Sequence, residues 1–107
     1  MEPEPNLIII DLEATCSSDR SLPNWEMEII EIGAVAVRES DGKYLSEFGS
    51  FVRPVRHPRL NRFCTELTSI TQADVDGAQL FPIVMDKLVL WLADFEPYTF
   101  CSWGGYD

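Results

Sequence analysis

Basic residues are scarce in this 107-residue chain, which has 8 Lys and Arg against 18 Asp and Glu and a formal net charge of −10. A nucleic-acid-binding protein usually presents a basic face to the phosphates, so the overall charge argues against such a partner. No apolar run reaches the length of a membrane span, and the start, "MEPEPN", lacks the basic segment of a signal peptide. We therefore expect no membrane partner and a cytoplasmic location.

Cysteine is also rare. The three cysteines, Cys16, Cys64 and Cys101, are widely separated and show no CxxC spacing. This pattern argues against a disulfide framework and against a zinc site, so we expect reduced thiols. With 46% hydrophobic residues, a chain of this length can bury one core, which limits it to one domain.

The few basic residues are unevenly distributed. Four of the eight fall in "RPVRHPRLNR", residues 53–62, which contains no acid and includes the chain's only histidine, His57. Arg56 and Arg59 are candidates for contact with phosphate groups. A solvated, proline-rich connection is the alternative, and we expect no catalytic role for His57.

Two acids follow an apolar run in "LIIIDLEATC", residues 7–16. Positions i and i+2 of a β-strand share one face, about 6 to 7 Å apart, so Asp11 and Glu13 would point the same way. Two like charges raise each other's pKa unless a cation lies between them. Either the strand ends at Ile10 and the acids are solvated, or the pair binds a cation.

Periodicity and turn signals predict the order β, β, β, α, α, β. The last strand follows a helical crossover, so it should lie parallel to the first, with both carboxyl ends at one edge of the sheet. Asp107 would then arrive near the two acids, and three carboxylates suit Mg²⁺ or Mn²⁺. The predicted elements are a strand at 6–13, a hairpin from "EIIEIGAVAVRE" and "YLSEFGSFVRP", a helix capped by Thr71, a helix from Pro82 to before Pro97, and a strand in "YTFCSW".

The remaining prominent side chains have structural interpretations. Two acids beside the second strand, Glu28 and Glu31, are interpreted as solvated, with a supporting role at the metal site as the alternative for Glu31. The large apolar residues outside the motifs are interpreted as packing residues: Trp25, Met27, Met85 and Trp91.

Four motifs, taken in order, resemble the DEDD exonucleases of the ribonuclease H-like fold: "DLEATC", "EIIEIGAV", "HPRLNRFCTELTSIT" and "CSWGGYD". The likeness covers residues 7–107. It is nearest to the histidine-bearing subgroup, which includes the exonuclease of histone-mRNA and small-RNA turnover and bacterial relatives described as inhibitors of the KinA pathway. It implies an α/β fold, a ribonuclease H-like mixed sheet with flanking helices.

The resemblance also implies a site and a reaction. Asp11, Glu13 and Asp107 match catalytic acids that hold two Mg²⁺ or Mn²⁺ ions. The reaction would be hydrolytic removal of nucleotides from the 3′ end of RNA or of short single-stranded nucleic acid, with RNA and DNA both left open. The positions that hold the terminal nucleotide in relatives are matched by Ala14, Phe63, Leu67 and Trp103.

Two parts of the family's site have no match among the 107 residues: a catalytic histidine and a fourth aspartate, both on a later helix. We therefore expect residues 1–107 to be the N-terminal part of a single, C-terminally truncated exonuclease domain, inactive alone. The alternative is a non-catalytic module that binds nucleic acid or restrains a partner such as a kinase.

Overall fold

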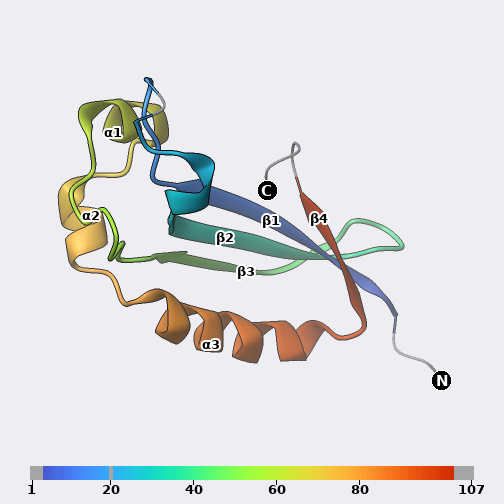
Figure 1. Cartoon of the computed structure of the whole chain (residues 1–107). Coiled ribbons are helices and arrows are strands. Elements are labelled where there is room, and N and C mark those ends of the chain that lie inside the picture. The colour runs from blue at the N-terminus through green and yellow to red at the C-terminus, as the bar shows by residue number, and fades with distance from the viewer. Residues whose placement is uncertain (1–3, 20, 103–107) are drawn as a thin grey trace.

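The computed structural model describes residues 4–19 and 21–102, and its centre is a four-stranded sheet in the order β3-β2-β1-β4 (Figure 1). β1 pairs antiparallel with β2, β2 pairs antiparallel with β3, and β4 pairs parallel with β1. The predicted hairpin and the predicted parallel return are both confirmed. The strands are β1 (Asn6–Ala14), β2 (Ile29–Arg38), β3 (Tyr44–Phe51) and β4 (Tyr98–Ser102).

Both predicted helices are present. Before α2, Thr71 and Asp74 form a capping box, in which each side chain accepts a hydrogen bond from the other residue's backbone N–H. α3 has Pro82 in its first turn, where no intrahelical N–H is needed. None of the described helices is long and apolar enough to cross a membrane. The helical elements are η1 (Asn24–Glu26), α1 (Arg62–Thr68), α2 (Gln72–Asp76), α3 (Phe81–Leu92) and η2 (Ala93–Phe95).

Helix α1 was not predicted from the sequence. The side chain of Asn61 caps it by accepting a hydrogen bond from the backbone N–H of Cys64 at 2.8 Å. Arg62 and Glu66 form an ion pair one turn apart, and the helix ends at Ser69, which has a left-handed φ of 64°. The Asn61 cap was the available signal, but a helix of 7 residues has too few turns to show a hydrophobic period.

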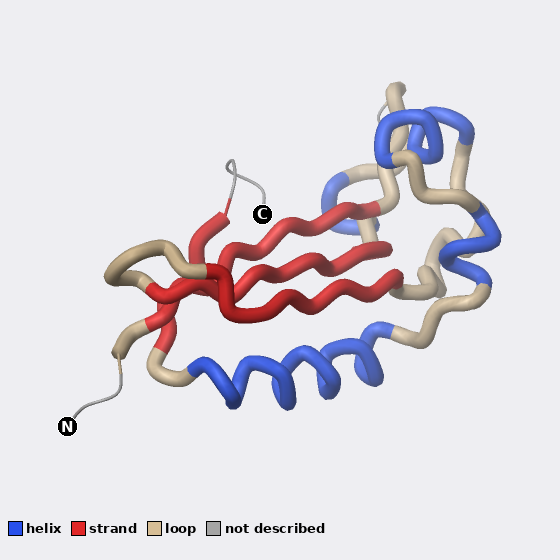
Figure 2. The backbone as a smooth tube through the Cα atoms, turned by 180° about the vertical axis from the view of Figure 1, so that it is seen from behind, coloured by secondary structure: helices blue, strands red, loops and turns tan. Residues whose placement is uncertain are grey.

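Helix α3 lies along one face of the sheet, as two opposite views show (Figures 1 and 2). A second cluster lies beneath α1 and α2 at the end of the sheet and is formed by Ile30, Cys64, Ile70 and Val75. The buried residues of the main core are Ile8, Ile32, Ala34, Ala36, Val52, Val84, Leu88 and Leu92. The opposite face of the sheet carries half-buried apolar side chains, among them Leu7, Ile9, Val35 and Val37.

The core assignment predicts unequal effects for one conservative change. Ile8 is 0% exposed and Ile83 is 46% exposed. Removing one methyl group from a filled core leaves a small cavity, so Ile8→Val should lower the free energy of unfolding by about 0.5–1.5 kcal/mol. The matched variant Ile83→Val should change it by less than about 0.5 kcal/mol. Urea unfolding measures both, and equal losses would contradict the assignment of this face as the core.

Candidate active site

The two acids of the first motif lie on the sheet face opposite α3. β1 continues through them to Ala14, so the interpretation that the strand ends at Ile10 is wrong. Asp11 is paired with Gly33 of β2, and Glu13 is paired with Glu31. Because alternate residues of a strand share a face, the strand directs both acids to the same side.

Glu31 joins the two acids and increases the negative charge of this face. It lies directly across from Glu13, and like charges in such a pair repel each other. Burial raises the pKa of Glu31, and the charges of Asp11 and Asp74 raise it further. Within the described parts of the chain, neither Asp11 nor Glu31 forms an ion pair. Asp11 and Glu31 therefore offer carboxylate oxygens that no described cation neutralises, and a hard divalent cation prefers such donors.

The third predicted ligand, Asp107, lies outside the described residues, as does Trp103. β4 is described as far as Ser102, which is paired with Ile10. Because β4 is parallel to β1, it runs toward the same end of the sheet as Asp11. Within residues 4–19 and 21–102, no three His, Cys, Asp or Glu side chains form a group that would hold a metal ion.

A cavity of about 560 Å³ opens beside Glu13. Two of the predicted nucleotide contacts, Ala14 and Leu67, line it together with this acid. Phe63 is not among its lining residues, but it precedes Leu67 by one turn of α1 and is 39% exposed. Four further lining residues were not predicted from the sequence: Cys16, Thr68, Asn24 of η1 and Met27, the residue after η1.

A pair of thiols holds α1 beside the end of β1. The buried Cys64 donates a hydrogen bond from Sγ to the carbonyl oxygen of Ala14 at 3.8 Å. Burial raises the pKa of Cys16 to about 11, and the neighbouring Cys64 thiol contributes to the shift. Both cysteines are free, and Cys16 stays protonated at neutral pH. It therefore acts here as a packing group.

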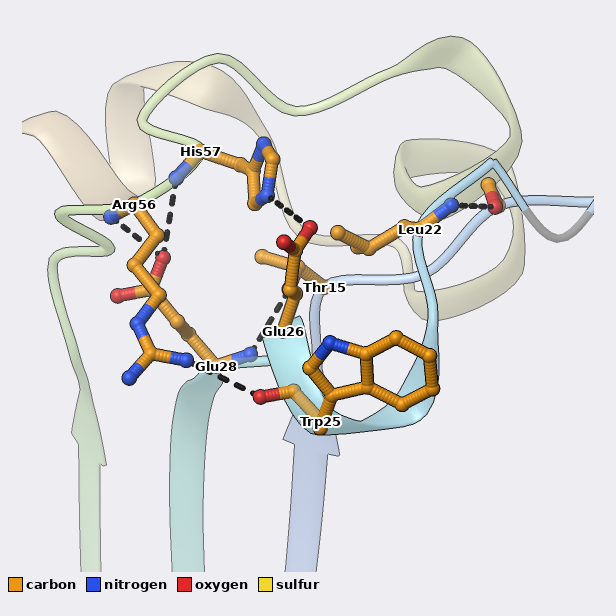
Figure 3. Close-up of polar contacts among 8 residues, drawn as sticks. Thr15, Leu22, Trp25, Glu26, Glu28, Arg56 and His57 are labelled. Carbon is orange, nitrogen blue, oxygen red and sulfur yellow. Dashed lines mark hydrogen bonds and ion pairs between the residues drawn. The ribbon is translucent and has the colours of Figure 1, made fainter.

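Glu28 binds the basic segment through the protein backbone (Figure 3). Its carboxylate accepts three hydrogen bonds from consecutive N–H groups, those of Val55 at 2.8 Å, Arg56 at 2.7 Å and His57 at 3.0 Å. The interpretation of Glu28 as a solvated acid is therefore wrong. Its partners lie 27 to 29 residues away in the chain, beyond the reach of any local pattern.

The same segment contacts η1 through two side chains. The Arg56 guanidinium donates from Nη1 to the carbonyl oxygen of Trp25 at 3.1 Å, and His57 Nε2 lies 3.3 Å from Glu26 Oε2. Arg59 is exposed and forms no ion pair with a described residue. Figure 3 shows these contacts joining the loop to η1.

Of the four residues predicted to pack, two lie against the main core. Met85 and Trp91 pack against the main core, as expected, and Trp91 also donates a hydrogen bond from its indole to Ser46. Met27 is half-buried and lines the cavity beside Glu13. The prediction was wrong for Trp25, which is 78% exposed.

Comparison with known proteins agrees with this arrangement of strands. Residues 8–98 match the family described as exonuclease (RNase_T). The chain belongs to this exonuclease family. The sequence resemblance to DEDD exonucleases and the ribonuclease H-like fold class are thereby confirmed.

Three relatives are informative. The 3'-5' exonuclease Snipper of Drosophila melanogaster is 46% identical over 86% of this chain and 33% of its own length. ERI1 exoribonuclease 2 of Danio rerio is 43% identical over 84% of this chain and 16% of its own length. The crystallographic structure of the nuclease domain of 3'hExo, a DEDDh family member, bound to rAMP, matches with a TM-score of 0.88 at 34% identity, covering 97% of this chain and 54% of that one. The chain described here therefore spans between about a sixth and about half of the length of these relatives.

The raised pKa of Glu31 predicts a pH-dependent stability. The folded-state pKa of this acid lies above its ordinary value of 4.5. The fold therefore loses stability as pH rises from about 4.5 through the folded-state pKa, because the charged carboxylate is disfavoured in the folded state. Below about pH 4.5 the acid is protonated in both states and this loss disappears. In metal-free buffer, Glu31→Gln should raise the melting temperature at pH 7 and leave it unchanged near pH 4. The matched control is Glu39→Gln, an exposed acid beyond β2. An equal gain in both variants would assign the effect to net charge alone.

Proposed function

We propose that this chain supplies the acidic end and the nucleotide pocket of a 3′–5′ exonuclease that acts on single-stranded nucleic acid, with RNA as the main substrate. The observation that carries the proposal is the pair Asp11 and Glu13 on one face of β1, beside a cavity that Ala14 and Leu67 also line. The names of the relatives, a 3'-5' exonuclease and an exoribonuclease, support the reaction and the choice of RNA.

The acids would hold two divalent ions, Mg²⁺ or Mn²⁺. We assign Asp11 and Glu13 to this role, with Asp107 as the third ligand. The uncompensated charge at Asp11 and the raised pKa of Glu31 support the assignment, because a bound cation would relieve both. When bound, such ions supply electrostatic stabilisation of the attacking and leaving oxygens.

The terminal nucleotide would lie in the cavity beside Glu13. Its volume of about 560 Å³ falls in the range of small-ligand pockets. Leu67 and Phe63 on α1, with Trp103, would contact the base through apolar surface, and the backbone of Ala14 would contact the sugar. Apolar and aromatic contacts of this kind hold any base, so we expect little sequence preference.

Residues 1–107 alone would not catalyse at a useful rate. The only histidine, His57, lies beside Glu26 in the loop that Glu28 binds, and it does not line the cavity beside Glu13. A positioned general base typically contributes about 10²- to 10⁴-fold to a rate, and the family's histidine has no match here. The fourth aspartate is also unmatched, which would weaken one metal site.

Asp11→Asn tests the metal assignment. Removing one charged ligand should weaken Mn²⁺ binding by at least about tenfold, measured by calorimetry on the 107-residue chain, because carboxylates are the preferred ligands of hard cations. In a chain that also carries the family's histidine and fourth aspartate, RNA turnover should fall by orders of magnitude. Asp11 is exposed, so the melting temperature of the metal-free protein should not fall.

The control for this test is Glu39→Gln, which removes one negative charge away from the two acids. Undiminished Mn²⁺ affinity in Asp11→Asn would remove the two-metal proposal. RNA binding without turnover in the completed chain, unaffected by chelator, would instead favour a non-catalytic binding module.

The basic loop should contribute to RNA affinity through phosphate contacts. Replacing both Arg56 and Arg59 with alanine should weaken binding of single-stranded RNA and lower the slope of log affinity against log salt by about 1.4, or about 0.7 for each lost contact. Fluorescence anisotropy from 50 to 200 mM salt measures the slope. The matched control is Arg38→Ala, whose side chain already pairs with Asp41. Identical slopes for the parent and the double variant would contradict the phosphate contacts and support the alternative that residues 53–62 are a solvated connection.

A further inference from the structure

Trp25 occupies a defined position on the surface, although its indole is largely exposed. η1 is closed by hydrogen bonds from Glu26 N to Pro23 O at 2.9 Å and from Met27 N to Asn24 O at 3.2 Å. The carbonyl oxygen of Trp25 accepts from the Arg56 guanidinium. The backbone of this tryptophan is therefore held, and its side chain extends away from Arg56 and Glu28 (Figure 3).

Two cavities meet at Met27, the residue after η1, and Trp25 itself lines neither of them. Met27 lines the cavity beside Glu13 and also a second one of about 590 Å³, whose lining includes Arg53 and Arg56. Since Met27 borders both spaces and Asn24 of η1 lines the first, a chain-like ligand that leaves the first cavity for the second passes along η1. A third cavity, lined by Cys16 and Arg59 among others, measures only about 230 Å³, which is smaller than a typical ligand pocket.

The second cavity has an uncompensated positive charge. Arg53 is exposed, and its guanidinium forms no ion pair with any residue in the described ranges. Glu28 also borders this cavity, but its carboxylate already accepts three backbone N–H bonds, so it does not neutralise the arginines by pairing with their guanidinium groups. Anionic groups are favoured at such a surface, and a phosphodiester chain carries them at each step.

We propose that the strand whose 3′ nucleotide lies beside Glu13 continues over η1, with one upstream base stacked on the Trp25 indole and the following phosphates near Arg53 and Arg56. The assignment rests on the proposed function, because it takes the 3′ end as the occupant of the first cavity. The ligand is single-stranded nucleic acid, since a base inside a duplex is stacked between its neighbours and offers the indole no free face. Trp25 is a positioning residue that extends the binding site beyond the terminal nucleotide.

The test compares ligands of two lengths. Anisotropy with a fluorescein-labelled, ten-nucleotide single-stranded RNA in chelator measures strand binding without cleavage, and competition with adenosine 5′-monophosphate measures the terminal site. Stacking on an aromatic side chain is worth about 1–3 kcal/mol per base, so Trp25→Ala should weaken decamer binding by about 5- to 150-fold. Binding of the mononucleotide should stay unchanged, and Trp25→Phe should recover most of the decamer affinity.

The matched control is Leu90→Ala, which removes another exposed apolar side chain, 74% accessible on α3. It should leave both affinities unchanged. Unaltered decamer binding in Trp25→Ala, with the parent still binding RNA, would overturn this inference and leave the proposed function intact. Equal losses of affinity for the decamer and for the mononucleotide would also overturn the inference, because they would show that Trp25→Ala disturbs the terminal site. A parent chain that binds neither ligand would overturn the inference and the proposed function together.

Discussion

The pairing register of β1 determines the position of the candidate site. Ile8 lies opposite Ala36 in the main core, and Asp11 lies opposite Gly33 on the other face. A slip of one residue would exchange the two faces, exposing Ile8 and turning Asp11 and Glu13 toward α3. Moving two carboxylates from water into the core costs several kcal/mol each, so this alternative is strongly disfavoured. The apolar pattern that folds the sheet therefore also fixes which way the acids point.

The arrangement of acids on β1 and β2 lowers the stability of the metal-free fold. Glu13 and Glu31 face each other across two strands, and Asp11 adds a third negative charge close enough to raise the pKa of Glu31. Repulsion of this kind serves no purpose in a sheet that only needs to fold, because neutral pairs would stabilise it better. A divalent cation held by Asp11 and Glu13, as proposed, would offset this repulsion, because the bound positive charge would lie beside the charges that oppose folding.

Local signals in the sequence predicted the parts of the fold that local physics determines. β-Branched apolar runs, a turn signal and one alternating segment predicted the three-stranded part of the sheet, and the Thr71 cap predicted α2. The acids were found because i and i+2 share a strand face. Long-range contacts left no such signal: the interpretation of Glu28 as solvated failed because its amide partners lie 27 to 29 residues away. Asn24 and Met27 were missed at the cavity for the same reason.

The acidic composition and a nucleic-acid partner are compatible because one acid has a structural use. Glu28 is negatively charged, but its carboxylate is satisfied by the amide groups of residues 55–57 rather than by a guanidinium. The loop is thereby fixed beside η1 while its arginines stay available, with Arg56 making a hydrogen bond to the carbonyl oxygen of Trp25 and none to a described carboxylate. A net charge of −10 is an average over the surface, whereas a single strand responds to the charge within about 10 Å of its path.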